Sequence, residues 1–326
     1  MKVAIISDLH FGVHGSDAMF REHLVDFLED VFFPTLAERD IGTIFVLGDI
    51  FDKRKRLDVE DIATAQAFFI DRIVENGLNA YIVAGNHDLY SREKNDLAMF
   101  DLLARPYTRN ITTILDTFVT EIGKRKVGFM AWNASKIISP NEAELLFGHL
   151  DIVDVTKSGT SKLHLHMLEG FDGVYSGHFH FRVKKGNINY IGTPIRNNRG
   201  EDYEHGFAIL DLDTLELEHV ANPVDPYYDV VRGPVTDEMV SAAKGKVVRV
   251  FLGDNIDEDD VARLESVAYK LEIVDNSIKE FSDVAKSATV EDETNVLDIA
   301  SSILEERKVA DERKGVIIEQ LEGLLE

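Results

Sequence analysis

Short apolar runs alternate with longer amphipathic stretches from the start of the chain to about residue 220. The short runs are rich in β-branched and aromatic residues, which is typical of buried strands. The longer stretches repeat apolar residues at helical spacing, and Gly77 lies where one of these helices should end. The alternation predicts an α/β fold. Expected strands are Lys2–Ser7, Thr43–Leu47, Ala80–Ala84, Lys126–Ala131, Glu144–Phe147, Gly173–Ser176 and Ile188–Ile191, and expected helices are Asp17–Arg39, Asp58–Asn76 and Asp96–Leu103.

Two prolines in Asn222–Pro226 interrupt this pattern and indicate a domain boundary, with a first domain over residues 1–224. Beyond it, residues 225–281 predict a small α+β domain. Its expected elements are a strand over Val247–Leu252, a helix over Asp257–Lys270 and a strand over Leu271–Asp275.

The end of the chain is predicted to be a linker followed by two short helices. Residues 282–294 are polar and acidic with few large apolar side chains, which indicates a linker. Residues 295–326 place apolar residues at helical spacing. Two short helices cannot bury both apolar faces alone, so we expect them to dock on the body or on a partner protein.

Composition is that of a globular protein, since 326 residues with 44% hydrophobic content can bury a full core. No apolar stretch approaches the roughly 18 residues of a membrane-spanning helix. The chain turns polar at Ser7, too early for a signal peptide, so an intracellular protein is expected. The absence of cysteine excludes disulfides and zinc–thiolate sites.

The net charge of −24 argues at first against a polyanionic partner, which would need Lys and Arg. About half of this charge lies after Thr236. Part of the remainder belongs to carboxylates whose charge bound cations would offset. Local basic clusters therefore remain available for nucleic acid.

Five clusters of His, Asp and Asn each follow an expected strand, where the loops of an α/β sheet converge on one edge. Nitrogen and oxygen ligands without thiolates suit Mn²⁺, Mg²⁺, Fe²⁺ or Zn²⁺. Burying so many ionisable groups without a cation would be costly. The clusters predict a paired metal site, which is a device for attacking phosphate esters. They are Asp8-Leu9-His10, Gly48-Asp49-Ile50-Phe51-Asp52, Gly85-Asn86-His87-Asp88, Gly148-His149 and Gly177-His178-Phe179-His180.

In this order the clusters resemble the motifs of the calcineurin-like metallophosphoesterase superfamily, which implies a two-sheet sandwich flanked by helices. A closer resemblance is to the SbcD nuclease family, and it is most like the compact bacteriophage recombination nucleases of that family. It rests on Ser7-Asp8-Leu9-His10-Phe11-Gly12, Ser176-Gly177-His178-Phe179-His180 and Tyr190-Ile191-Gly192-Thr193-Pro194.

The resemblance implies two divalent ions, with Mn²⁺ the expected metal and Mg²⁺ the alternative. His87 would be the acid catalyst, because an imidazole can release a proton near neutral pH. Asp52 and Asp88 would orient the ligands or His87, although some relatives carry His at the position of Asp52. One ion would bind Asp8, His10, Asp49 and His180, and the other Asp49, Asn86, His149 and His178, with Asp49 as the bridge.

Two basic groups are candidates for contact with DNA phosphates. Lys53, Arg54, Lys55 and Arg56 follow the second cluster and should lie at the rim of the metal site, although a solvated helix start would look the same. Phosphate contacts carry no base information, so cleavage should not depend on sequence. The second group contains Arg182, Lys184, Lys185, Arg196 and Arg199.

The other histidines are interpreted as structural or exposed. Residues 162–167 alternate in strand fashion, so His164 and His166 are expected on a solvated face or a cleft wall rather than on a metal. No motif surrounds His14, His23, His205 or His219.

The resemblance implies a DNA nuclease subunit for DNA end processing, recombination and repair. It would act as a 3′-to-5′ exonuclease on duplex ends and an endonuclease on single strands. It would form a homodimer within a heterotetramer with an SMC-like ATPase of the SbcC type, which residues 295–326 would bind, and residues 225–281 would guide DNA. The expected location is the bacterial cytoplasm, where the protein could be encoded either by the host or by a phage.

Two alternatives remain. One is a phosphodiesterase for small molecules, against which the additional C-terminal region and the basic rim argue. The other is a non-catalytic scaffold with the same fold, which would be expected to have lost ligands.

Overall fold

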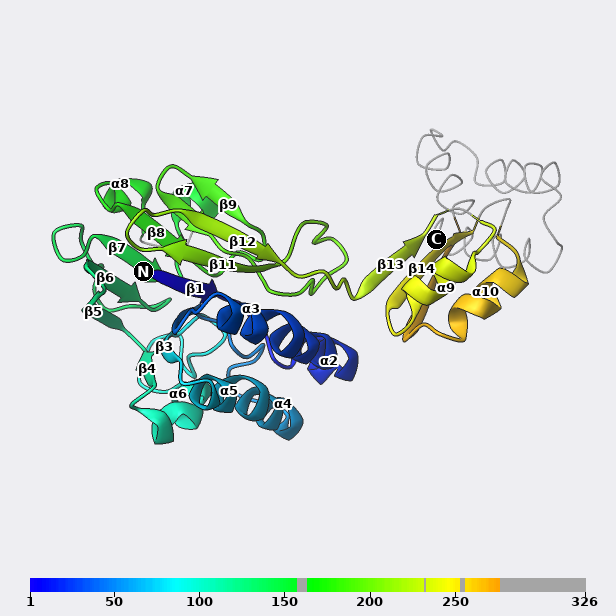
Figure 1. The fold of residues 1–326 in the computed structure, drawn as a ribbon, viewed down its shortest axis with the longest axis horizontal. Helices are drawn as coiled ribbons and strands as arrows, with labels where there is room; N and C mark the ends of the chain where they lie inside the picture. Colours follow the sequence, from blue (N-terminus) through cyan, green and yellow to red (C-terminus); the bar gives the residue numbers. More distant parts are fainter. Residues whose placement is uncertain (157–162, 232, 253–255, 276–326) are drawn as a thin grey trace, which may run out of the picture. The chain divides into compact units, whose positions relative to one another are not determined.

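The computed structural model describes residues 1–156, 163–231, 233–252 and 256–275, which fall into two compact units (Figure 1). The first unit is Met1–Pro226, and the second begins at Tyr227. The expected linker over residues 282–294 and the expected helices over residues 295–326 lie outside the described residues.

The described part of the first unit contains two six-stranded mixed sheets, so the expected α/β sandwich is confirmed. Antiparallel pairing lies at one margin of the first sheet and at both margins of the second, and the other neighbouring strands pair in parallel. The first sheet has the order β12 (Leu217–Ala221), β11 (Gly206–Asp211), β1 (Lys2–Ile6), β2 (Thr43–Leu47), β3 (Asn79–Val83) and β4 (Ile111–Ile114). The second has the order β5 (Thr117–Ile122), β6 (Arg125–Met130), β7 (Leu145–Gly148), β8 (Gly173–Ser176), β10 (Ile188–Tyr190) and β9 (Val183–Lys185).

Two long helical runs cover the outer face of the first sheet (Figure 1). The side chains of Asp17 and Asp58 cap their first turns by accepting from the amides of Met19 and Glu60, each at 2.9 Å. Each run carries one π-helical segment in its middle. The first run is α2 (Ala18–Asp26), Phe27–Phe32 and α3 (Phe33–Glu38), and the second is α4 (Val59–Ala65), Gln66–Ile70 and α5 (Asp71–Glu75). Shorter elements are α1 (Val13–Ser16), α6 (Met99–Ala104), a 3₁₀ turn at Arg105–Tyr107, α7 (Val153–Thr156) and α8 (Leu165–Leu168).

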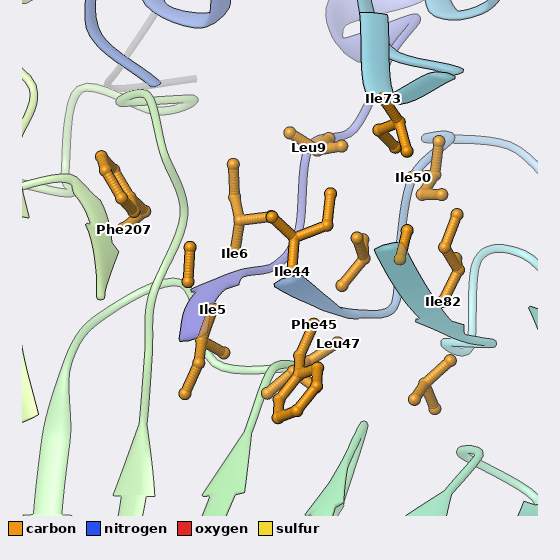
Figure 2. Packing of buried hydrophobic residues seen from close by; sticks show 14 of the residues in the cluster. Ile5, Ile6, Leu9, Ile44, Phe45, Leu47, Ile50, Ile73, Ile82 and Phe207 are labelled. Atoms are coloured by element: carbon orange, nitrogen blue, oxygen red, sulfur yellow. The ribbon is translucent and has the colours of Figure 1, made fainter. Parts of the chain in front are cut away.

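Strand β2 lies at the centre of the core, and all five of its residues are buried. Figure 2 shows Phe45 and Leu47 on one side of β2 and Ile44 on the other. The Phe45 ring contacts Phe147 of the second sheet, with ring centroids 4.7 Å apart. A strand covered on both faces needs a continuous apolar run rather than an alternating one, which explains the composition of Thr43–Leu47.

The second unit has three parallel strands in the order β13 (Tyr227–Val230), β14 (Val247–Leu252) and β15 (Lys270–Asp275). Helices α9 (Asp237–Ala243) and α10 (Glu258–Glu265) connect them. The expected helix over Asp257–Lys270 is too long. It ends at Glu265 because the chain must return to pair Lys270 with Val247.

The strand-like interpretation of residues 162–167 is wrong. Leu165–Leu168 forms one helical turn, in which Leu168 is buried and His166 is exposed. Among the described residues no helix has the length and apolarity needed to cross a bilayer.

Candidate metal centre

The five clusters meet at one edge of the sandwich. Asp8, Asp49 and Asn86 follow β1, β2 and β3 of the first sheet, while His149 and His178 follow β7 and β8 of the second. Backbone hydrogen bonds join neighbouring loops, from Asp8 N to Gly48 O at 2.9 Å and from Gly177 N to Gly148 O at 3.1 Å. The side chains meet because parallel strands end at the same edge.

One group of candidate ligand atoms is centred on Asn86. Its Oδ1 lies 2.9 Å from His149 Nε2 and 2.9 Å from His178 Nδ1. The Asp49 Oδ2 atom lies 3.3 Å from the same His149 nitrogen. These are the four residues expected to hold one of the ions.

The other group joins Asp8, His10 and His180, whose candidate ligand atoms all lie within 4.8 Å of one another. The His10 Nε2 atom is 3.9 Å from Asp8 Oδ1 and 3.9 Å from Asp49 Oδ2. Asp49 Oδ2 therefore faces both groups.

The donors fit divalent ions, and His10 gives the clearest test. It is 3% exposed, and among the described residues neither of its ring nitrogens has a hydrogen-bond partner. Buried polar atoms are nearly always paired, and a cation would satisfy the orphaned nitrogen that faces Asp8 and Asp49.

Burial also sets the electrostatics of the candidate ligands. It lowers the pKa of His10 to about 3 and that of His178 to about 4, so both rings are held in the neutral form that metals bind. It raises the pKa of Asp8 to about 6. Burial would also raise the pKa of Asp49, but the adjacent His149 outweighs it and keeps this pKa below its usual range. Such a concentration of perturbed groups is typical of a functional site.

The backbone around the ligands is strained. Asp8, His10, Asp49 and His178 adopt left-handed conformations with φ of 55°, 49°, 54° and 88°. Each costs about 1–3 kcal/mol and persists only when the surrounding structure imposes it. At Gly85 a Cβ atom would collide with the Asp49 carboxylate, so the loop can approach this ligand only without a side chain.

Asp88 organises the loop that carries Asp49. Its carboxylate accepts hydrogen bonds from the backbone amides of Asp49, Gly85 and Ile50 at 2.7, 2.8 and 3.0 Å. The side chain is 4% exposed. Asp88 therefore acts on the backbone that presents Asp49.

The half-buried His87 lies beside His10, with ring centroids 5.1 Å apart. Its backbone amide donates to Asp49 Oδ1 at 2.7 Å, and its ring Nδ1 is hydrogen bonded to the backbone carbonyl of Asp52. The Asp52 carboxylate instead faces His10 Nδ1, at 3.8 Å. Asp52 thus contacts His87 through its main chain and His10 through its side chain.

The basic residues after the second cluster differ in their surroundings. Lys53, Lys55 and Arg56 are exposed, and Lys55 lies over the ring of Tyr90. Arg54 is half-buried. It lies 5.5 Å from the centre of the Trp132 ring and donates from Nε to the backbone carbonyl of Asn86, so it supports a ligand loop.

The second basic group is divided between ion pairs and exposed lysines. The Arg196 guanidinium is 13% exposed and pairs with Asp225 at 2.9 Å, and it also donates to the backbone carbonyl of Arg199. Arg182 lies 3.3 Å from Glu204. Lys184 and Lys185 are exposed on β9.

Glu201 is a site residue that no sequence motif indicated. Its carboxylate lies 2.7 Å from His180 Nδ1. It stands 21 residues further along the chain, in a polar loop with no spacing signal. The histidines that the sequence analysis interpreted as structural or exposed lie outside the three described clusters of candidate ligand atoms. His164, for example, lies 3.5 Å from Asp154.

Several known proteins are similar to this chain. The family model described as calcineurin-like phosphoesterase matches residues 1–182, a span that contains all five clusters. The chain is 24% identical over 297 residues to exonuclease subunit 1 of Enterobacteria phage T4, which covers 86% of each protein. A solved structure described as a novel archaeal phosphodiesterase aligns with 16% identity over 68% of this chain and all of that one, with a TM-score of 0.38. The family match extends over more than half of the chain and confirms the resemblance inferred from the motifs. The chain belongs to the calcineurin-like phosphoesterase family and is a hydrolase of phosphoester bonds.

Proposed function

We propose that the protein is the nuclease subunit of a DNA-processing complex, acting as a 3′-to-5′ exonuclease on duplex ends and as an endonuclease on single strands. The observation that carries this is the convergence of seven candidate ligands and His87 at one sandwich edge. The relative named as an exonuclease subunit, which aligns over most of both chains, supports the choice of substrate.

The metal centre would consist of two divalent ions, held by Asp8, His10, Asp49 and His180 and by Asp49, Asn86, His149 and His178. Carboxylate, amide and imidazole donors without thiolates suit Mn²⁺, with Mg²⁺ as the alternative. Bound there, such ions supply positive charge for the scissile phosphate and activate a water for attack.

His87 would give a proton to the departing sugar oxygen. Its Nδ1 atom is held by the Asp52 carbonyl, so that nitrogen carries the ring proton of the neutral form and Nε2 is the atom that can take up and release the mobile one. General acid catalysis of this kind contributes about 10²–10⁴-fold to a rate. Asp88 would serve the same step indirectly, since it fixes the loop of Asp49, whose carboxylate accepts from the His87 amide.

The exposed side chains of Lys53, Lys55 and Arg56 would bind the phosphates of DNA. Arg54 would contribute less, because its Nε already donates to the backbone carbonyl of Asn86. Arg196 and Arg199 remain weaker candidates, because the Arg196 guanidinium already pairs with Asp225. Residues 225–281 would form the capping domain that guides DNA to the centre.

The partner would be an SMC-like ATPase of the SbcC type, bound by residues 295–326, with a homodimer of this chain inside a heterotetramer. Such a complex would serve DNA end processing, recombination and repair in the bacterial cytoplasm. Deleting residues 295–326 should leave Mn²⁺-dependent cleavage intact and abolish its stimulation by ATP and the ATPase. Full stimulation of the truncated chain would exclude this segment as the binding element.

One assay separates the nuclease from the alternatives. Purified full-length protein with Mn²⁺ is given end-labelled duplex DNA and, separately, a small chromogenic phosphodiester, with Asp49→Asn as the inactive control. Shortening of the duplex from its 3′ ends supports the proposal. Hydrolysis of the small ester alone would identify a small-molecule phosphodiesterase, and hydrolysis of neither despite bound Mn²⁺ would identify a scaffold.

A further inference from the structure

We propose that Glu201 is a positioning residue for the metal centre, which orients His180 and thereby sets the affinity of the ion held by Asp8, His10 and His180. The proposal rests on the metal centre of the proposed function and not on its DNA substrate.

The contact between Glu201 and His180 is short and well enclosed. Glu201 Oε1 lies 2.7 Å from His180 Nδ1, and the Glu201 side chain is 13% exposed. Its other oxygen accepts from the backbone amides of Asn197 and Asn198 at 2.9 and 3.1 Å. The carboxylate is therefore fixed from behind, and only its Oε1 edge is directed at the histidine.

The loop that carries Glu201 is itself braced. The Arg196 guanidinium donates to the backbone carbonyls of Asn198 and Arg199, and it also forms an ion pair with Asp225. The backbone carbonyl of Asn197 is hydrogen bonded to His14 Nε2. Arg196, which the sequence suggested as a DNA contact, therefore stabilises this loop. The polar side chains of the loop are needed for these hydrogen bonds.

The charge of Glu201 suits this role. The hydrogen bonds to its two oxygens come from nitrogen atoms, namely the backbone amides of Asn197 and Asn198, the Asn198 side chain at 3.2 Å and His180 Nδ1. The carboxylate therefore accepts a hydrogen bond from the Nδ1–H group of the imidazole. A histidine that donates from Nδ1 to a carboxylate presents Nε2 to a metal and becomes a more basic ligand.

The four candidate ligand histidines are not supported alike in the described structure. His149 places Nδ1 2.8 Å from the neutral carbonyl of Leu47, and His178 places Nδ1 toward Asn86 and His149. Of the four, His180 has a ring nitrogen within 3 Å of a carboxylate that is not itself a candidate ligand. The ion at His180 should therefore depend on Glu201, and the ion at His149 and His178 should not.

Glu201→Gln tests this in the full-length protein, with Glu204→Gln as the matched control. Glu204 is three residues away, is 74% exposed and pairs with Arg182, so it carries the same charge without touching His180. Mn²⁺ binding is measured by isothermal titration calorimetry and by the electron paramagnetic resonance of free Mn²⁺. We expect one of two sites to weaken about 10–100-fold in Glu201→Gln and both to stay unchanged in Glu204→Gln.

A second measurement does not depend on a variant. In the metal-free wild type, the ¹⁵N chemical shifts of His180 should show the proton on Nδ1, and in Glu201→Gln this preference should weaken. With the His180 ring in its neutral form, a proton on Nε2 instead of Nδ1 in the wild type would overturn the proposal, as would two wild-type Mn²⁺ sites in Glu201→Gln. If the wild type bound no Mn²⁺, the metal centre of the proposed function would fail as well, so the two failures are distinct.

Discussion

Replacing Asp88 by Asn should destabilise the first unit, even though the two side chains have nearly the same shape. The Asp88 Oδ2 atom accepts from the amides of Asp49 and Gly85, and Oδ1 accepts from those of Ile50 and Phe51 at 3.0 and 3.4 Å. An asparagine has one accepting oxygen. Two buried amides would therefore lose their acceptor and face an NH₂ group instead.

The magnitude follows from those two bonds. A hydrogen bond to a charged group contributes about 1.5–3 kcal/mol, so two of them amount to about 3–6 kcal/mol. Burial and the charge of Asp49 raise the pKa of Asp88, so part of the advantage of the charged form is lost near neutral pH. We therefore expect the lower end, about 3 kcal/mol, which is a large fraction of a typical folding free energy of about 5–15 kcal/mol.

The assay is urea unfolding of the metal-free full-length protein, followed by far-ultraviolet circular dichroism. Asp58→Asn is the control, because Asp58 caps a helix and Asn is an equally good cap. Hydrogen exchange should accelerate in Asp88→Asn alone at one pair of these amides, either those of Asp49 and Gly85 or those of Ile50 and Phe51. A free energy of unfolding within about 0.5 kcal/mol of the wild type would refute the reasoning, since that is the range of an ordinary surface change.

Three further predictions concern catalysis, DNA and the metals. His87→Asn should lose about 10²–10⁴-fold in cleavage rate while Mn²⁺ stoichiometry and DNA affinity stay unchanged, and loss of bound Mn²⁺ would reject the role of proton donor. Lys53→Glu and Lys55→Glu should each weaken DNA binding and reduce the slope of log affinity against log salt concentration by about 1. Lys124→Glu, in the turn between β5 and β6, is the control and should change neither quantity. An equal effect at Lys124 would contradict the role of the basic residues at the rim of the site. Mn²⁺ at about 100 times its Kd should raise the free energy of unfolding in urea titrations by about 2.7 kcal/mol for each occupied site, and the same rise in Asp49→Asn would show that the ions bind elsewhere.

How well several of the strands could be predicted depends on how they are covered, although the buried strand β11 was missed as well. Strands β1, β2 and β8 have four or five buried residues in a row, so their continuous apolar runs stand out in the sequence. Strands β5, β9 and β12 lie at the margins of their sheets with exposed residues, and the pattern did not distinguish them from loops. A half-exposed strand at the margin of a sheet lacks the run of apolar residues on which such predictions depend.

The helix starts were predictable for a local reason. Asp17 and Asp58 cap the helical runs that follow them through bonds to amides two residues away. The return of the chain after α10 was not predictable from helical spacing, because it depends on pairing Lys270 with Val247, far back in the sequence.

The sequence by itself determined the chemistry of the site, because each ligand cluster is a short motif directly after an apolar strand, with glycine where the backbone must approach a ligand. Only the tertiary structure decided what stands behind those ligands. Glu201 reaches His180 across 21 residues, and Asp88 reaches the amides of Asp49 and Ile50 across 39 and 38 residues. Arg196 donates to the carboxylate of Asp225, which is 29 residues away in the chain. The candidate ligands follow from local order along the chain, whereas their support comes from contacts that exist only once two sheets and their loops have packed together.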